Sequence, residues 1–257
     1  MTSFAEALAE RHPLVLNAAM GTRLSTRGRD GPTGRNLDDP EEVRALHGLD
    51  VAAGADVLFT NTFAVPTRRE WRTIVSAGVR LAREAAGPQR FVVGSIAPVG
   101  PIDHRLSLAE AMVAQGADGL VLETFTAPEA VATLATLKGH MPTEVPIVVS
   151  LWRWRRVITT ARELQEAGAA AIGCNCQVGM GPMRRWVRMM KGAIDLPLMV
   201  KPSACLPGAP PASARSFEAA VPELLGRGAC LFGGCCGTTN EHVAALRRAL
   251  DRRAVRP

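Results

Sequence analysis

The stretch Ala229-Cys230-Leu231-Phe232-Gly233-Gly234-Cys235-Cys236-Gly237-Thr238-Thr239-Asn240-Glu241 joins a short apolar run, a glycine-rich turn and a helix signal. The run 229–232 predicts a buried strand. Thr238 to Glu241 has the S/T-x-x-E pattern of a capping box, which predicts the start of a helix. The two adjacent cysteines therefore lie in a turn between the carboxyl end of a strand and a helix. Parallel α/β folds place their functional groups in such turns.

The same strand-to-helix pattern recurs along the whole chain. Eight short apolar runs predict strands, and seven of them are followed within a few residues by a segment with helical spacing. The predicted strands cover residues 14–19, 56–60, 91–96, 119–123, 146–151, 171–175, 197–201 and 229–232.

Capping residues and glycines mark the predicted helix boundaries. Asp39 followed by Pro40 is a helix cap with proline at the first helical position. Further capping boxes predict helix starts at Thr67, Ser107, Thr126 and Thr160. Glycines at positions 54, 116 and 168 each predict the end of a helix before the next strand begins.

Strands that alternate with helices predict parallel βαβ units, and eight such units in 257 residues predict a (β/α)8 TIM barrel. We expect residues 1–257 to form this single, somewhat shortened barrel domain. A doubly wound sheet is the alternative. The barrel is favoured because polar or special residues follow nearly every strand. Two connections look irregular: 23–39 is suited to a lid, and the proline-rich 203–216 is expected to be extended.

Composition disfavours several classes of protein. Hydrophobic residues make up 47% of the chain and charged residues 21%, as in ordinary globular domains. No apolar run approaches the roughly 18–20 residues of a membrane helix, and residues 1–6 do not resemble a secretory signal. Six cysteines are too few for a disulfide scaffold, which favours the reducing cytoplasm. The net charge of +6 is dispersed and aromatic residues make up only 4%, so nucleic-acid binding is disfavoured.

In a barrel, the carboxyl ends of all eight strands surround one pocket, so Cys176 after the sixth strand should meet Cys235 and Cys236. Three thiolates with one open position form the arrangement of a catalytic zinc, and sulfur ligands favour Zn²⁺ over Mg²⁺ or Ca²⁺. A substrate thiol at the open position would lose its proton and become nucleophilic. We therefore predict these three cysteines as metal ligands and catalytic residues. Taken alone, the adjacent pair is also compatible with packing or a vicinal disulfide.

Other strand ends supply candidate substrate-binding groups. A buried carboxylate such as Glu123 needs a partner, either a substrate ammonium or a backbone amide. The remaining candidates can bind an amino-acid substrate or simply end their strands. They are Asn17, Met20, Gly21 and Thr22 after the first strand, Asn61 and Thr62 after the second, Ser95 after the third and Asn175 after the sixth.

The blocks 17–22, 60–63, 94–98, 123–125, 173–176 and 233–238 resemble, in order, those of the homocysteine S-methyltransferase family. That family includes S-methylmethionine- and betaine-dependent enzymes and the homocysteine half of cobalamin-dependent methionine synthase. The resemblance covers nearly the whole chain, and G-x-N-C and G-G-C-C-G are its most specific blocks. It implies a zinc barrel with Glu123 at the homocysteine site. It also implies methyl transfer from an activated, sulfonium-type donor to homocysteine or a related thiol.

The sequence departs from the family pattern at several positions. Much of the family has aspartate where this chain has Asn17, which removes a charge that could hold an amino group. Cys205 stands in place of a glycine and is either a surface thiol or a fourth zinc ligand. Trp152 and Trp154 lie in an unusual Trp-Arg-Trp-Arg-Arg run. They can stack on a sulfonium donor or form an exposed interface.

Two other functions stay open at this stage. Lys201 at the end of the seventh strand can serve as the Schiff-base residue of a barrel lyase, with the glycines at 233 and 234 holding phosphate. A zinc-binding barrel that acts only with a partner subunit is the non-enzymatic alternative. The expected partners are a small thiol acceptor and a methyl donor. A homo-oligomer or a partner subunit is also compatible with the sequence.

Overall fold

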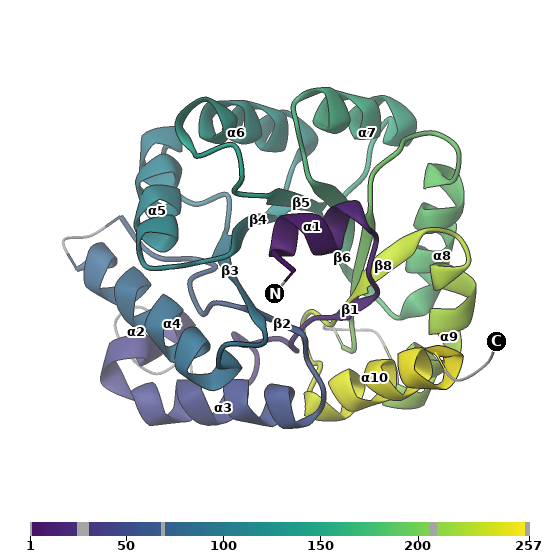
Figure 1. Ribbon diagram of the computed structural model, residues 1–257, viewed down its shortest axis with the longest axis horizontal. Helices are drawn as coiled ribbons and strands as arrows, with labels where there is room; N and C mark the ends of the chain where they lie inside the picture. Colours follow the sequence, from purple (N-terminus) through teal and green to yellow (C-terminus); the bar gives the residue numbers. More distant parts are fainter. Residues whose placement is uncertain (1, 25–30, 68–69, 206–209, 255–257) are drawn as a thin grey trace.

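The computed structural model describes residues 2–24, 31–67, 70–205 and 210–254 and contains one barrel of eight parallel strands surrounded by helices (Figure 1). The strand order is β1-β8-β7-β6-β5-β4-β3-β2, and β1 meets β2 through a bridge between Leu16 and Val57. This order closes the sheet on itself, which confirms the predicted TIM barrel and excludes the doubly wound alternative.

The strands lie where the apolar runs predicted them. β4 and β6 continue beyond their predicted ends, and the hydrogen-bond register shifts near the carboxyl end of each. The strands are β1 Leu14–Val15, β2 Val57–Phe59, β3 Phe91–Ile96, β4 Gly119–Phe125, β5 Ile147–Leu151, β6 Ala171–Val178, β7 Leu198–Ser203 and β8 Ala229–Phe232.

The described helices cover the outside of the barrel, except for α1. They are α1 Phe4–Ala9, α2 Gly31–Asp38, α3 Pro40–Ala52, α4 Trp71–Ala86, α5 Ile102–Ala114, α6 Ala127–His140, α7 Val157–Glu166, α8 Met180–Met190, α9 Ala214–Leu225 and α10 Asn240–Ala254.

Five of the predicted helix boundaries are confirmed. Asp39 accepts a hydrogen bond from the Glu42 amide, and Pro40 occupies the first helical position of α3. Thr126 is the N-cap of α6, although its hydroxyl bonds the Glu129 carboxylate and not a backbone amide. The glycines at 54, 116 and 168 follow helix ends in the left-handed conformation that glycine adopts easily.

The other capping-box predictions are wrong. Ser107 and Thr160 lie inside α5 and α7, since these helices begin at Ile102 and Val157. The box at Thr67 also fails, since α4 begins only at Trp71. Thr238 does not cap α10 because its hydroxyl donates to the Cys235 carbonyl oxygen at 2.7 Å. The S/T-x-x-E pattern alone does not distinguish a helix start from a helix interior.

The seam between β1 and β2 is closed mainly by backbone contacts and one side chain. The Asn17 amide nitrogen donates to the Val57 carbonyl oxygen at 3.0 Å. The Asn17 side chain accepts from the Phe59 amide at 2.9 Å and donates back to the Phe59 carbonyl oxygen at 3.4 Å. Asn17 therefore imitates a strand residue where the two shortest strands meet.

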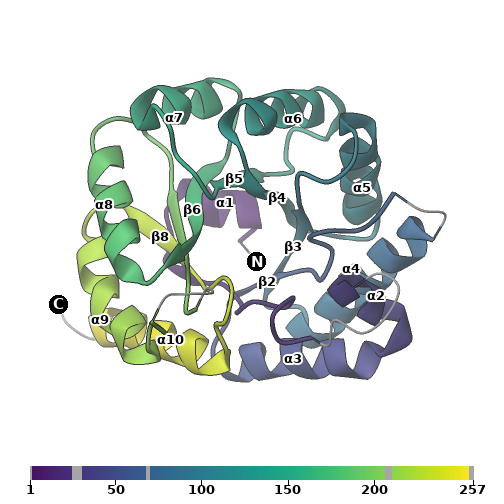
Figure 2. The same ribbon diagram turned by 180° about the vertical axis from the view of Figure 1, so that it is seen from behind.

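Helix α1 covers the amino-terminal end of the barrel, in front of the strands in Figure 1 and behind them in Figure 2. Phe4 and Leu8 are 2% exposed and pack with inward-facing residues of the barrel such as Val93 and Val148. The pocket described below therefore lies at the other end, where the strands have their carboxyl termini.

The two irregular connections are only partly as predicted. The connection 23–39 contains helix α2, so the expectation of an irregular lid is wrong for residues 31–38, and residues 25–30 lie outside the described residues. In the connection 203–216, residues 210–213 form neither helix nor strand, with Ser213 extended, and α9 begins at Ala214; residues 206–209 lie outside the described residues. Within the described ranges, no helix is both long and apolar enough to cross a membrane.

His47 provides a test of the fold's response to acid. It is fully buried on α3, and neither ring nitrogen has a hydrogen-bond partner among the described residues. Burial, together with the charge of Arg23, lowers the pKa of His47 from 6.5 to about 3. Between these values the unfolded chain binds a proton that the folded chain does not. Its free energy of unfolding should therefore fall by about 2 kcal/mol between pH 7 and pH 5 from this group alone.

Urea denaturation at both pH values measures this effect. The His47→Leu variant should lose about 2 kcal/mol less than the parent on acidification, whereas His140→Gln, which removes an exposed histidine, should behave as the parent. Equal acid sensitivity of all three proteins would contradict the assignment.

Candidate active site

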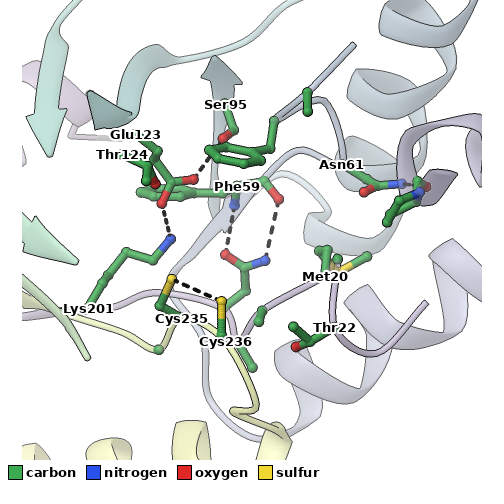
Figure 3. Close-up of a pocket in the computed structure, with 18 of the residues that line it drawn as sticks. Met20, Thr22, Phe59, Asn61, Ser95, Glu123, Thr124, Lys201, Cys235 and Cys236 are labelled. Atoms are coloured by element: carbon green, nitrogen blue, oxygen red, sulfur yellow. Dashed lines mark hydrogen bonds and ion pairs between the residues drawn. The ribbon is translucent and has the colours of Figure 1, made fainter. Parts of the chain in front are cut away.

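A cavity of about 380 Å³ opens at the carboxyl ends of the strands (Figure 3). Its wall combines the segment after β1, the ends of β2, β3, β4 and β7, and the turn after β8. The three predicted metal ligands, Cys176, Cys235 and Cys236, all line it. The barrel thus brings together residues that lie far apart in the sequence.

The three cysteines form a compact cluster of sulfur atoms. The Sγ atoms of Cys176 and Cys235 lie 3.0 Å apart, and those of Cys235 and Cys236 lie 4.0 Å apart. All three sulfurs are within 4.8 Å of one another, and each residue is half-buried. The prediction that these thiols meet at one point is confirmed.

Cys176 reaches the cluster because the backbone departs from a regular strand. Its φ is +56°, a left-handed conformation that is strained for a non-glycine residue. The register with β7 also shifts between Asn175 and Val178. Cys174, two residues earlier, packs with the buried residues between strands and helices. Cys174 is part of the core and does not face the same way as Cys176, because the distortion at Cys176 breaks the alternation of the strand.

Close packing and one hydroxyl hold the turn that carries Cys235 and Cys236. A Cβ atom on Gly234 would lie 2.3 Å from the Thr238 Oγ1 atom, so only glycine fits there. That oxygen donates to the Cys235 carbonyl and accepts from the Ala19 amide at 3.1 Å. Gly233 is equally constrained by the Leu16 side chain. Packing thus accounts for both glycines, and a phosphate-binding role is not needed to explain them.

The thiols of the cluster differ in acidity from the core thiols. The hydrogen bond with Cys235 raises the pKa of Cys176, whereas hydrogen bonds from Cys176 and Cys235 lower the pKa of Cys236 to about 3. Burial raises the pKa of Cys174 to about 12 and that of Cys230 to about 11. The cluster therefore stabilises a thiolate at neutral pH, and the two core cysteines stay protonated.

The cluster fits a tetrahedral zinc ion with one position left for another ligand. Two thiolates at about 2.3 Å from one zinc lie roughly 3.8 Å apart, and the distances of 3.0 and 4.0 Å bracket this value. Thiolate sulfur is also the donor that zinc accepts readily. The open side of the cluster faces the cavity, where a substrate would lie.

Glu123 faces the same cavity but already has two partners. Its Oε1 accepts from the Lys201 Nζ at 2.5 Å, and its Oε2 accepts from the Ser95 hydroxyl at 2.7 Å (Figure 3). Lys201 Nζ also lies 4.3 Å from the centre of the Phe59 ring. Glu123 and Lys201 thus form a buried ion pair within the cavity wall.

Most of the other predicted polar residues line the cavity and also have partners within the protein. Asn17 is bonded to Phe59 as described above, and Asn61 donates to the Pro32 carbonyl oxygen and to Asn36. Met20, Gly21 and Thr22 form part of the wall, and the Thr22 hydroxyl accepts from the Gly237 amide.

Thr62 and Asn175 lie behind the wall. Thr62 is fully buried and donates to the Ser95 carbonyl oxygen. Asn175 is also fully buried. It accepts from Ser150 and donates to Thr124, the second non-glycine residue of the wall with a left-handed backbone. These two residues position their neighbours, whatever else binds nearby.

Comparison with known proteins matches residues 14–250 to the model of the homocysteine S-methyltransferase family. The chain belongs to the homocysteine S-methyltransferase family.

The family's members include proteins of different length. The methionine synthase of Mycobacterium leprae (strain TN) is 26% identical over 310 residues, which cover 98% of this chain but 25% of that protein. The S-methylmethionine–homocysteine S-methyltransferase BHMT2 of Pongo abelii is 27% identical over 83% of this chain and 70% of its own length. The chain thus spans about a quarter of the length of the methionine synthases that it matches.

Solved structures agree in fold. The apo form of the homocysteine methyltransferase MmuM from Escherichia coli superposes with a TM-score of 0.76 at 26% identity, over 95% of this chain and 98% of that one. Its metallated form gives a TM-score of 0.76 at 23% identity, over 92% and 96% of the two chains. The resemblance inferred from the sequence blocks is confirmed.

The positions at which this family member departs from the sequence pattern lie mostly outside the cavity. Cys205 is exposed and lies against Gly237, where an added Cβ would be 2.3 Å from its sulfur, but it is not part of the three-sulfur cluster. Trp154 packs on Trp186 with ring centres 5.2 Å apart. Neither Trp152 nor Trp154 is among the described residues that line the cavity, so stacking on a donor there gains no support.

Sequence reasoning missed the aromatic and apolar part of the wall. Phe59, Phe63 and Pro32 line the cavity, and Phe63 is 40% exposed. Phe59 is the last residue of β2, and the inward alternation of that strand would have placed it. The ion pair of Lys201 with Glu123 has no local signal, because it joins β7 to β4 across the barrel.

Substitution of Asn175 measures how much the hydrogen bonds behind the cavity wall contribute to the free energy of unfolding. Asn175→Ala leaves the buried Ser150 hydroxyl and the half-buried Thr124 hydroxyl each without one partner, so the free energy of unfolding should fall by roughly 2–4 kcal/mol. Gln177→Ala is the matched control. It removes a hydrogen bond to the Trp152 carbonyl oxygen at a partly exposed site and should cost less than about 1 kcal/mol. Urea denaturation measures both, and equal losses would contradict this role of Asn175.

Proposed function

We propose that the protein is a zinc-dependent S-methyltransferase. In this proposal it moves a methyl group from a sulfonium donor to homocysteine or a related thiol, which gives methionine or a thioether. The observation that carries the proposal is the cluster of Cys176, Cys235 and Cys236, whose open side faces the cavity. Family membership supports the acceptor, since relatives of similar length are named for homocysteine.

Zinc would be held by these three thiolates, and when bound it supplies a site that keeps an acceptor thiol deprotonated at neutral pH. The protein's own contribution is the placement of the three sulfurs. The strained backbone at Cys176 and the packed turn at Gly234 hold them on one side and leave the cavity side open. No histidine lines the cavity within the described ranges, which agrees with chemistry that needs no general base.

Methyl transfer from the sulfonium donor to the thiol needs no third reactant. A lone pair of the acceptor sulfur forms the new S–C bond to the methyl carbon. The bond from that carbon to the donor sulfur breaks, and its electron pair stays on the donor, which leaves as a neutral thioether. The thiol proton is released when the thiolate forms. Apolar walls such as Phe59 and Phe63 would exclude water from the two sulfurs.

The two alternative functions have less support. A Schiff-base lysine reacts as the free amine, whereas Lys201 makes an ion pair with Glu123 and lies over an aromatic ring, contacts that suit an ammonium ion. In our proposal the barrel, residues 1–257, acts as one domain. We place it in the cytoplasm, since all six cysteines are free.

Metal content and methyl transfer test the proposal together. The purified, reduced protein should contain about one zinc per chain and should methylate homocysteine with S-methylmethionine or S-adenosylmethionine. Cys236→Ala should lose the zinc and lower the activity more than about a hundredfold, because two thiolates bind zinc poorly. Cys205→Ala, which removes a neighbouring thiol outside the cluster, is the control and should keep both properties.

Each outcome separates the alternatives. A folded parent without zinc, prepared without chelators, would overturn the zinc mechanism. Zinc without methyl transfer to any thiol, and activity only after a partner protein is added, would favour the subunit role.

A further inference from the structure

The charged groups of the cavity wall neutralise each other. Besides the cysteines, Glu123 and Lys201 are the charged residues among the described ones that line the cavity. They face each other at 2.5 Å, and their side chains are 9% and 7% exposed. The wall therefore presents a closed ion pair where a single free carboxylate would be needed to select an ammonium ion.

An acceptor with an α-ammonium group would meet both members of this pair. Any position within hydrogen-bond distance of the Glu123 carboxylate is also close to the Lys201 ammonium, since one bond joins them. Repulsion by Lys201 then offsets attraction by Glu123. Ser95 occupies the second carboxylate oxygen, which reduces the room for a further donor.

Asn17 cannot replace the missing free carboxylate. The side chain is neutral and 2% exposed, and both ends of its amide are bonded to the backbone of Phe59. Rotating it toward a substrate would break both of its side-chain hydrogen bonds to Phe59. Asn17 therefore contributes shape to the cavity but no charge.

The rest of the wall is largely apolar and favours contact with the alkyl part of an acceptor. Phe59, Phe63, Met20, Ala18 and Ala64 line the cavity and would contact the carbon chain of an acceptor. Removing apolar surface of an acceptor from water is favourable whatever its head group is. Binding energy at this wall thus comes mainly from the alkyl part of the thiol.

We propose that the acceptor range of this protein includes thiols without an α-ammonium group, and that it binds such short alkyl thiols at least as well as homocysteine. This inference rests on the proposed function for its chemistry. The expected specificity follows from the ion pair of Glu123 with Lys201 and from the Asn17 side-chain amide, which is bonded at both ends to the backbone of Phe59.

Two acceptors that differ in one group test it. 4-Mercaptobutanoate has the carbon chain, thiol and carboxylate of homocysteine but lacks the ammonium. Titration calorimetry on the zinc-loaded protein gives Kd for both, and methyl transfer with the same donor gives kcat/KM. We expect the Kd values to agree within about threefold, because the closed pair of Glu123 and Lys201 offers no net charge to the ammonium.

A charge variant makes the test specific to the ion pair. Lys201→Gln keeps a hydrogen-bond donor for Glu123 but removes the positive charge, so the carboxylate becomes free to attract an ammonium. Homocysteine should then bind roughly tenfold more tightly than 4-mercaptobutanoate. Lys191→Gln, at an exposed position after α8, is the control and should leave the ratio of the parent unchanged.

The outcomes for binding and turnover are separate. A preference of the parent for homocysteine by more than tenfold in Kd overturns the inference, as does a Lys201→Gln variant with an unchanged ratio. Near-equal Kd values without methylation of either thiol support the cavity's indifference to the ammonium but overturn the proposed transferase. Failure of either thiol to bind overturns both.

Discussion

The structure depends on one geometric requirement, which is that three sulfur atoms from two distant segments lie within 4.8 Å of one another. Cys176 and Cys235 are separated by 59 positions, and they meet because β6 and β8 both pair with β7, which places the carboxyl ends of the two strands beside one opening. The local distortions follow from this requirement. Cys176 adopts a left-handed backbone, and Gly234 allows Thr238 to pack against the turn at a distance that no side chain would permit. Two of the four non-glycine residues with a left-handed backbone among the described residues, Thr124 and Cys176, line the cavity.

Most polar groups of the cavity wall have hydrogen-bond partners within the protein. Asn17, Asn61 and Glu123 all have partners within the protein, and Asn175 links two strand ends from behind. Such satisfied networks avoid the cost of buried polar atoms without partners. They also leave few polar groups of the wall free to bind a substrate. The shape and the apolar surface of the cavity therefore contribute more to substrate selectivity.

The sequence was sufficient for the fold and for the meeting of the three cysteines, for a physical reason. Strand ends in a parallel barrel converge, so the residues after β6 and β8 could be placed together without knowing any side-chain contact. Helix starts were less predictable, since Ser107 and Thr160 match a capping pattern within helix interiors. The sequence also did not predict Lys201 as the partner of Glu123. Lys201 approaches it across the barrel, and that distance depends on the register of four strands.

The position of α1 limits how small molecules can enter and leave the cavity. This helix seals the amino-terminal end of the barrel with Phe4 and Leu8, so the cavity opens at the opposite end. In the proposed methyl transfer, two reactants would therefore enter and two products would leave through the same opening. A product that stays bound there would block the next reactant, so the order of product release would contribute to the turnover rate.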